Sequence, residues 1–322
     1  MAAAKTVLLT GATGFVGANL ARALLKAGHR VHLLLRSESA SWRIREIEAD
    51  VTTHVARLAD YKETRALVKR LHPDWIFHLA AHGAYSFQTG WAEMLQTNVL
   101  GTVHLLESAL EEGFEAFVHA GSSSEYGLKD HPPAEEEPLE PNSHYAVTKA
   151  SATLFCKHAG LVKKAPVRVL RLYSVYGPYE EPDRLMPTLL RAASSGKWPV
   201  LVDPAVARDF VHTDDVCRAF ISAAENPNQE PGAVYNVGSG RQTTIGELVD
   251  TVKKLLPIRE EPKFGSMPNR AWDTTCWVSN PAKISNAIGW RAEIDLEQGL
   301  RRTLQWFSEK PELARFYDEF KR

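Results

Sequence analysis

Apolar runs of strand length recur along the first half of the chain, and segments with helical periodicity separate them. A strand at 6–9, a helix ending near Ala27 and a strand at 31–35 make a first β-α-β unit. Gly28 follows this helix at the position where a left-handed residue is favoured. The runs lack polar alternation, as expected of parallel strands covered by helices on both faces. Further strands of this kind are predicted at 75–79, 116–120 and 167–172.

The regular alternation ends near residue 174, where prolines begin to interrupt shorter segments. We therefore predict an α/β fold, with a doubly wound parallel sheet of the Rossmann type at 1–173 and a smaller α/β substrate-binding domain at 174–322. A strand and helix over 209–224 and an apolar strand over 234–238 interrupt the second part. Segments near 209–238 are expected to return to the first domain.

Charge and cysteine usage narrow the classes of function. The 38 Lys and Arg residues nearly balance the 39 Asp and Glu residues, so no strong field favours nucleic acid or an anionic membrane as partner. Cys156, Cys217 and Cys276 form no C-x-x-C pair, which argues against structural disulfides and a zinc site. No apolar run reaches membrane-spanning length, and the first strand begins too early for a secretion signal. A cytoplasmic protein without a metal is expected.

A glycine-rich loop lies between the first predicted strand and the first helix. Its sequence is Thr10-Gly11-Ala12-Thr13-Gly14-Phe15-Val16-Gly17. In such a loop the first glycine permits the tight turn, the second lets the backbone approach a pyrophosphate, and the third allows close helix–strand packing. The helix N-terminus adds unpaired N–H groups and the positive end of a dipole. The loop, with Thr13, Phe15 and Val16, predicts a dinucleotide cofactor site.

The end of the second predicted strand bears on which dinucleotide binds. It reads Leu35-Arg36-Ser37, without the acidic residue that takes the ribose 2′-hydroxyl of NAD(H). An arginine here can pair with a 2′-phosphate, so NADP(H) is favoured, with Ser37 beside Arg36. NAD(H) remains the alternative if Arg36 is simply an exposed residue at a strand end. Arg43 would assist if the intervening loop folds back.

Tyr145 and Lys149 begin a helical pattern that runs to about His158, and their i, i+4 spacing puts them on one helix face. Tyrosine is a poor base at its ordinary pKa of about 10, and lowering that pKa by about 3 units requires roughly 4 kcal/mol. An ammonium about 4 Å away supplies an interaction of this size at an effective dielectric of about 20. The pair is predicted to carry proton transfer. The same spacing recurs at Tyr317 and Lys321, which follow no glycine loop or serine cluster and are interpreted as a coincidence.

A serine cluster, Gly121-Ser122-Ser123-Ser124-Glu125-Tyr126-Gly127, follows a predicted parallel strand. Ligands of open α/β sheets bind at this edge. Ser122 is therefore a candidate to hold the reacting oxygen of a substrate. Ser123 and Ser124 are candidate substrate contacts, with plain turn residues as the alternative interpretation.

Taken in order, these motifs resemble those of the extended short-chain dehydrogenases/reductases that act on nucleotide-sugars. The resemblance covers nearly the whole chain and includes His78-Leu79-Ala80-Ala81, Asn98, the stretch 170–178 and the stretch 208–216. It implies that Ser122, Tyr145 and Lys149 are catalytic and that Asn98 supports the lysine side of the site. It also implies the following contacts: Leu79, Ala80, Ala81, Tyr145 and Lys149 with the cofactor, and Ser174, Arg208 and Arg270 with a nucleotide-diphosphate sugar.

The resemblance also bears on the reaction. Family 4,6-dehydratases place an acidic residue two positions after the catalytic Ser or Thr, where this chain has Ser124. The serine cluster is more similar to that of reductases acting on 4-keto-6-deoxy sugar nucleotides, and Arg36 suits an enzyme that consumes NADPH. We expect reduction of a C4 ketone, with Tyr145 as the proton donor. The alternatives are a 4-epimerase with tightly bound NAD, a 4,6-dehydratase and a non-catalytic NADP sensor, and the sensor is disfavoured because Tyr145 and Lys149 are both present.

Family resemblance implies a homodimer, formed through the helix that carries Tyr145 and the helix that begins near Trp91. The shape of the sugar pocket is expected to depend on loops such as 83–91.

Overall fold

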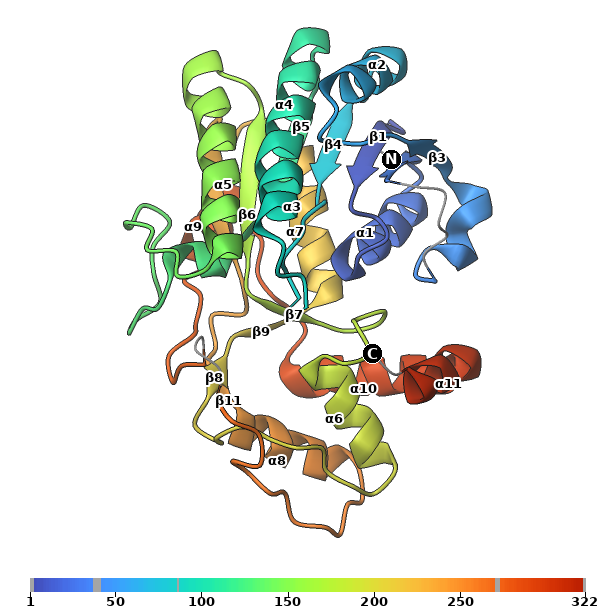
Figure 1. The fold of residues 1–322 in the computed structure, drawn as a ribbon, viewed down its shortest axis with the longest axis vertical. Helices are drawn as coiled ribbons and strands as arrows, with labels where there is room; N and C mark the ends of the chain where they lie inside the picture. Colours follow the sequence, from blue (N-terminus) through green and yellow to red (C-terminus); the bar gives the residue numbers. More distant parts are fainter. Residues whose placement is uncertain (1–2, 37–41, 86, 270–272, 321–322) are drawn as a thin grey trace.

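The computed structural model describes residues 3–36, 42–85, 87–269 and 273–320. Within these residues, a seven-stranded sheet has the order β10-β6-β5-β4-β1-β2-β3, and all its neighbouring strands are parallel (Figure 1). The expected doubly wound sheet is confirmed. Its strands are β1 (Thr6–Thr10), β2 (Arg30–Leu35), β3 (Thr52–Val55), β4 (Trp75–His78), β5 (Ala116–Ser122), β6 (Val167–Leu172) and β10 (Ala233–Val237).

The strand order reverses between β1 and β4. Strands β2 and β3 lie on one side of β1, whereas β4, β5, β6 and β10 lie on the other. In open α/β sheets the ligand crevice lies at such a reversal, outside the carboxyl ends of the strands. The glycine-rich loop leaves β1 at this point, and the serine cluster leaves β5 at the same edge.

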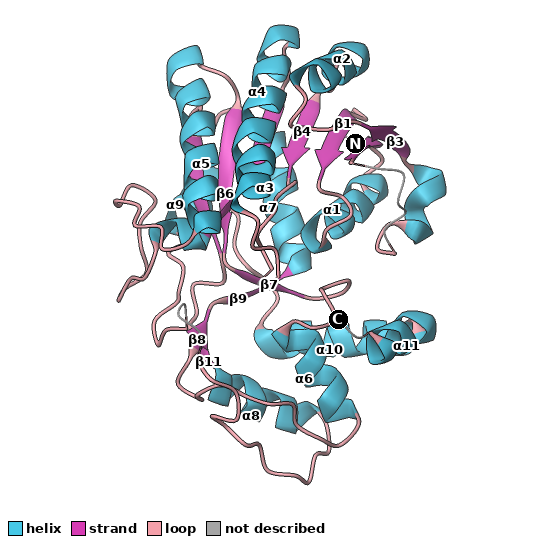
Figure 2. Ribbon diagram, viewed as in Figure 1, coloured by secondary structure: helices cyan, strands magenta, loops and turns pink. Residues whose placement is uncertain are grey.

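Helices cover both faces of the sheet because alternate strand side chains enter two separate cores (Figure 2). Val7 and Leu9 of β1 belong to one core, and Leu8 belongs to the other. Each fully buried side chain of this size contributes about 1.5–3 kcal/mol relative to exposure. The first core takes α1 (Phe15–Lys26) and α7 (Thr213–Glu225), and the second takes α2 (Tyr61–Leu71), α4 (Gly101–Glu112) and α5 (His144–Lys163).

Local caps determine where the helices begin and end. The Ser143 side chain accepts a hydrogen bond from the Ala146 N–H, so α5 starts with Tyr145 in its first turn. Asp60 caps α2 in the same way, accepting from two backbone N–H groups. Gly28 lies just past α1 with φ +83, which confirms the predicted left-handed residue.

A second part lies at the carboxyl edge of the sheet (Figure 1). It has its own apolar core, built from α6 (Leu185–Ser194), α8 (Ile245–Leu255) and α10 (Leu296–Glu309). Two small sheets lie between this core and the large sheet: β7 (Ser174–Tyr176) pairs with β9 (Phe210–His212), and β8 (Ala207–Arg208) pairs with β11 (Thr243–Thr244). The domain division at residue 173 stays a prediction.

Shorter elements complete the described chain. They are η1 (Arg45–Asp50), α3 (Trp91–Met94), the π-helical turn η2 (Leu95–Leu100), η3 (Ser123–Tyr126), α9 (Ala282–Ile288) and α11 (Pro311–Glu319). Among the helices of the described ranges, none combines the length and apolarity needed to cross a bilayer.

Candidate active site

The glycine-rich loop makes a tight turn between β1 and α1, and two of its glycines are required by close backbone approaches. Gly11 has φ +75, and an added Cβ would lie 2.5 Å from the carbonyl carbon of Leu79. A Cβ on Gly17 would lie 2.2 Å from the carbonyl oxygen of Gly11. Gly14 caps α1 without a side chain, which leaves the N–H groups of the first turn available to an anion. The loop therefore fits the pyrophosphate of a dinucleotide.

The other predicted cofactor residues lie around this loop. Leu79 N–H donates to the Thr10 carbonyl, and Ala80 N–H donates to the Thr10 hydroxyl, both at 3.2 Å. Ala81 follows them and is exposed. Half-buried positions are occupied by Thr13, Phe15 and Val16. The structure thus brings the segment after β4 and the start of α1 together at the switch point.

The two arginines considered for a 2′-phosphate differ in their surroundings. Arg36 is exposed at the carboxyl end of β2, and its side chain makes no hydrogen bond or ion pair within the described residues. Arg43 is buried, pairs with Glu181 at 2.6 Å and donates to the Tyr179 and Thr13 carbonyls. Its guanidinium therefore joins the glycine loop to the second part, and its contact with a cofactor 2′-phosphate stays a prediction. Ser37 lies outside the described residues.

Glu125 determines the shape of the serine cluster. Ser122 caps the short helix η3, and Glu125 accepts a hydrogen bond from the Ser122 N–H at 2.8 Å. The carboxylate also accepts from Arg171 Nε at 2.9 Å and from the Thr153 hydroxyl at 3.0 Å. Glu125 is 0% exposed, so its oxygens serve the protein interior and not the crevice. Sequence reasoning placed it near the chemistry but missed this role.

The serine hydroxyls lie beside the Tyr145 ring oxygen. Ser122 Oγ and Ser124 Oγ are 2.8 Å apart, and a hydrogen bond with the Ser122 hydroxyl lowers the Tyr145 pKa. Burial acts more strongly in the opposite direction and raises the Tyr145 pKa to about 12. Tyr145 is thus a protonated phenol at neutral pH.

Lys149 lies next to a side chain of the sheet, and its effect on the Tyr145 pKa stays a prediction. Its Nζ lies 3.3 Å from His119 Nε2, on the neighbouring strand β5. Burial lowers the Lys149 pKa to about 8, although the Glu125 charge partly opposes this. The charge of Arg184, at the start of α6, lowers the Tyr145 pKa. The i, i+4 spacing places both side chains on one helix face. It does not determine which side chain of a neighbouring element the lysine contacts.

Arg184 is the residue of the crevice that sequence reasoning missed most clearly. It is exposed, and its guanidinium carbon lies 5.4 Å from the ring centroid of Tyr85, in the loop that was expected to shape the sugar pocket. Nearby Glu180 has a buried carboxylate oxygen without a partner in the described residues, and burial raises its pKa to about 8. No motif marked these positions, because they follow Gly177 in an irregular segment.

Asn98 supports the site through a chain of hydrogen bonds. It lies in the π-helical turn η2 and exchanges hydrogen bonds with the His82 backbone, each at 2.8 Å. Its Nδ2 also donates to the Thr148 hydroxyl at 2.9 Å, and Thr148 donates to the Tyr145 carbonyl. Asn98 thus reaches the neighbour of Lys149 and fixes the first turn of α5.

The remaining serines have different surroundings. Ser123 is buried and lines a small pocket with Tyr173 and Trp277. The Tyr173 hydroxyl is buried and has no hydrogen-bond partner in the described residues. Ser174 is half-buried at the start of β7, and its N–H donates to the Asp209 carbonyl at 3.0 Å.

The predicted diphosphate clamp is only partly described. Arg208 pairs with Asp273 at 2.5 Å, and Asp273 is mostly buried. Sequence reasoning missed Asp273. Its position three residues after Arg270 was the signal that could have pointed to it. Arg270 itself lies outside the described residues.

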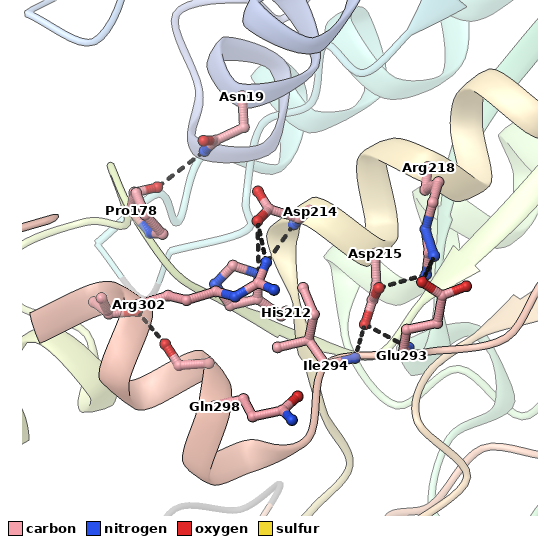
Figure 3. A network of polar contacts seen from close by, with 12 residues as sticks. Asn19, Pro178, His212, Asp214, Asp215, Arg218, Glu293, Ile294, Gln298 and Arg302 are labelled. Atoms are coloured by element: carbon pink, nitrogen blue, oxygen red, sulfur yellow. Dashed lines mark hydrogen bonds and ion pairs between the residues drawn. The ribbon is translucent and has the colours of Figure 1, made fainter. Parts of the chain in front are cut away.

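The rest of the 208–216 motif joins the two parts of the molecule (Figure 3). His212 caps α7, and Asp214 pairs with Arg302 of α10 at 3.2 Å. Asp215 accepts hydrogen bonds from the Glu293 and Ile294 N–H groups at 3.1 and 3.0 Å. On the opposite side, Asn19 of α1 donates to the Pro178 carbonyl at 2.9 Å. These contacts join the second part of the molecule to α1 and α7.

In the second tyrosine–lysine pair, the tyrosine has a structural role. Tyr317 is buried, and its hydroxyl donates to the Glu180 carbonyl. Its ring packs among the aromatic side chains of Trp42, Trp306, Phe307 and Phe316. Lys321 lies outside the described residues. In the part of the chain that the structure covers, no group of three or more His, Cys, Asp or Glu could hold a metal ion.

Comparison with known proteins gives consistent matches. The sequence model of the NAD dependent epimerase/dehydratase family matches residues 7–238. The chain is 27% identical over 329 residues to an Arabidopsis thaliana trifunctional UDP-glucose 4,6-dehydratase/UDP-4-keto-6-deoxy-D-glucose 3,5-epimerase/UDP-4-keto-L-rhamnose-reductase. That alignment covers 96% of this chain and 48% of the relative, so the chain spans about half the relative's length.

Two solved structures are similar over almost the whole fold. A Thermotoga maritima UDP-glucose 4-epimerase with UDP-glucose has a TM-score of 0.85 at 25% identity, covering 95% of this chain and 99% of that chain. A Bacillus anthracis dTDP-glucose 4,6-dehydratase in complex with NAD has a TM-score of 0.83 at 26% identity, covering 95% and 97%.

Proposed function

Because this chain belongs to the NAD-dependent epimerase/dehydratase family, we propose that it reduces the C4 ketone of a nucleotide-linked 4-keto-6-deoxyhexose. The observation that carries the proposal is the placement of the Tyr145 phenol against the Ser122 hydroxyl, with Ser124 and not an acid two positions after Ser122. With its pKa raised to about 12, the phenol is ready to donate a proton to a carbonyl oxygen. Reduction of a ketone uses the protonated phenol directly. Oxidation of an alcohol would first require deprotonation of the phenol to the phenolate.

The surroundings of Glu125 argue against dehydration by this chain, although named relatives include 4,6-dehydratases. Elimination of water needs an acid that reaches the sugar. Glu125 is fully buried, and Arg171, Thr153 and the Ser122 N–H occupy its oxygens. The position two residues after Ser122 holds Ser124, whose hydroxyl is a poor acid.

The chain's own residues fit a nicotinamide dinucleotide. The open N-terminal turn of α1 and Gly14 would hold the pyrophosphate, and exposed Arg36 would pair with the 2′-phosphate of NADPH. When bound, the cofactor supplies the hydride for the C4 carbon. Ser122 holds the ketone oxygen, Tyr145 protonates it, and the Lys149 charge favours the phenolate that remains. Arg208, oriented by Asp273, holds the nucleotide diphosphate.

A 4-epimerase with tightly bound NAD is the second candidate. The similarity to the Thermotoga maritima UDP-glucose 4-epimerase favours it. NAD, when bound, would take and return the hydride, while Tyr145 would take and return the proton with Ser122 and Lys149 in the same roles as above. The two reactions differ in their use of cofactor, because an epimerase regenerates its NAD in each cycle.

Cofactor stoichiometry tests the proposal. With a nucleotide-linked 4-keto-6-deoxyhexose, we expect one NADPH oxidised per sugar reduced, followed as loss of NADPH absorbance against product measured by chromatography. NADH is tested in parallel, because exposed Arg36 favours NADPH. Conversion of a nucleotide-sugar with no net cofactor use would establish the epimerase instead, and release of water from a 6-hydroxy sugar would establish a dehydratase.

We also propose that the enzyme is a homodimer. Helix α5 exposes Val147, Leu154 and Leu161 at seven-residue intervals, a spacing that keeps them on one face. Neighbouring exposed apolar side chains on α5, α3 and η2 extend this face: Phe155, Val162, Trp91 and Leu95. Exposed apolar surface of this kind marks an interaction site, and a two-fold axis would pack the stripe against the same stripe of a second copy.

Leu154→Asp is expected to separate the dimer. A buried carboxylate in an apolar interface costs several kcal/mol, enough to shift association by about 100-fold or more. Light scattering after gel filtration should give twice the 35.8 kDa chain mass for wild type and that chain mass for the variant. Val200→Asp is the matched control, since Val200 is equally exposed but lies outside this face. A wild-type protein that elutes as a monomer at micromolar concentration would refute the dimer.

A further inference from the structure

Lys149 lies in a buried layer one level below the serine cluster. Helix α5 runs antiparallel to β5, so that Tyr145 lies beside Ser122 at the sheet edge and Lys149 lies beside His119 deeper in the sheet. The Nζ–Nε2 distance is 3.3 Å. Lys149 is 2% exposed and His119 is 0% exposed, so the contact is shielded from bulk solvent.

The contact assigns the protons of both side chains. An ammonium can only donate, so His119 Nε2 must present its lone pair and carry its proton on Nδ1. His119 is neutral, because burial and the Lys149 charge hold its pKa well below its ordinary range. Its Nδ1 has no hydrogen-bond partner among the described residues. Among the described residues, the contact with Lys149 is therefore the hydrogen bond that the His119 ring makes.

We propose that His119 is a positioning residue that holds Lys149 as a charged ammonium beneath Tyr145, ready for the cofactor. The inference rests on the proposed function, in which Lys149 supplies positive charge at the reacting end of the crevice. An acceptor in a dry layer favours the charged form of the lysine, because a hydrogen bond to an ion is about twice as strong as one between neutral groups. Without it, burial alone would drive the lysine towards the neutral amine.

Other groups that face Lys149 do not replace His119. Glu125 of η3 acts through its charge, but its oxygens are bound by Arg171, Thr153 and the Ser122 backbone. His78 of β4 is neutral, with its pKa lowered to about 3 by burial. Its two ring nitrogens are bound to the Thr10 and Thr102 hydroxyls. Cys156, on α5 itself, is a protonated thiol because burial raises its pKa to about 12.

Cofactor binding across pH tests the proposal without a substrate. The dissociation constant for NADPH is measured by fluorescence from about pH 6 to about pH 10 for wild type, His119→Phe and His119→Gln. Phenylalanine keeps the ring volume without an acceptor, whereas glutamine keeps an acceptor near the Nε2 position. We expect the alkaline loss of binding to move down by about one to two pH units in His119→Phe. In His119→Gln it should stay near the wild-type midpoint. An unchanged midpoint in a folded His119→Phe, or the same shift in both variants, overturns the proposal.

A second measurement reads the His119 tautomer directly, and its decisive arm needs only the wild-type protein. Nitrogen-15 NMR of labelled histidine distinguishes the two neutral tautomers. His119 should carry its proton on Nδ1, and in Lys149→Met this preference should be lost. A proton on Nε2 in the wild type contradicts the contact. Because both readouts are independent of sugar reduction, an enzyme that fails to reduce 4-keto sugars refutes the proposed reaction and leaves this inference standing.

Discussion

Tyr145→Phe should lower the turnover of a 4-keto nucleotide-sugar by about 10²–10⁴-fold, the usual contribution of a positioned proton donor. The variant removes the phenol hydroxyl that lies beside Ser122 and is placed to donate a proton. The binding of NADPH should change little, because the glycine loop and Arg36 are untouched. Steady-state rates and NADPH titrations on the same preparation separate the two effects. Full turnover by Tyr145→Phe would remove Tyr145 from the mechanism.

Tyr317→Phe is the matched control for this substitution. It also deletes a buried phenol hydroxyl in a tyrosine–lysine pattern, but Tyr317 lies in the aromatic cluster of α11. We expect turnover within about twofold of wild type and a loss of about 1 kcal/mol in the free energy of unfolding, since one hydrogen bond to the Glu180 carbonyl disappears.

Glu125→Gln is expected to reduce the free energy of unfolding by about 3–5 kcal/mol, the usual effect of removing one partner of a buried ion pair. Arg171 is 3% exposed and would keep its charge in the interior without a counter-ion. Glutamine has the same shape, so the loss reports charge and hydrogen bonding and not a cavity. Urea unfolding followed by circular dichroism measures the change.

Glu297→Gln provides the comparison, because its pair with Arg301 is exposed and spans one helical turn. Its effect on unfolding should stay within about 0.5 kcal/mol. Equal effects in the two variants would mean that the Glu125–Arg171 pair contributes no more than a surface pair.

The cofactor end of the fold was predictable from sequence because each step there is local. The glycine spacing after an apolar strand requires a tight turn, and the positive φ of Gly11 with its close approach to Leu79 agrees with that requirement. The five apolar runs correspond to strands β1, β2, β4, β5 and β6. Strand β3 escaped notice because it is an edge strand with mostly exposed residues, so no apolar run marks it.

The substrate end was less predictable, because its charges are paired through residues distant in sequence. Spacing placed Lys149 on the same face as Tyr145, but the partner of its ammonium lies on another element, at His119. Arg43 lies close enough in sequence to serve the cofactor, yet Glu181 binds it. The partner of each charged side chain depends on which opposite charge or lone pair the tertiary fold places next to it. No local sequence pattern determines that partner.

The position of β10 at the edge of the large sheet has a consequence for synthesis of the chain. This strand pairs with β6, but the residues between them build β7, α6, β8, β9 and α7. At a translation rate of about 5–20 residues per second, β6 emerges several seconds before the strand that covers it. During that interval the apolar edge of β6 is open to other chains, so the nascent chain exposes a pairing edge that β10 covers in the finished sheet.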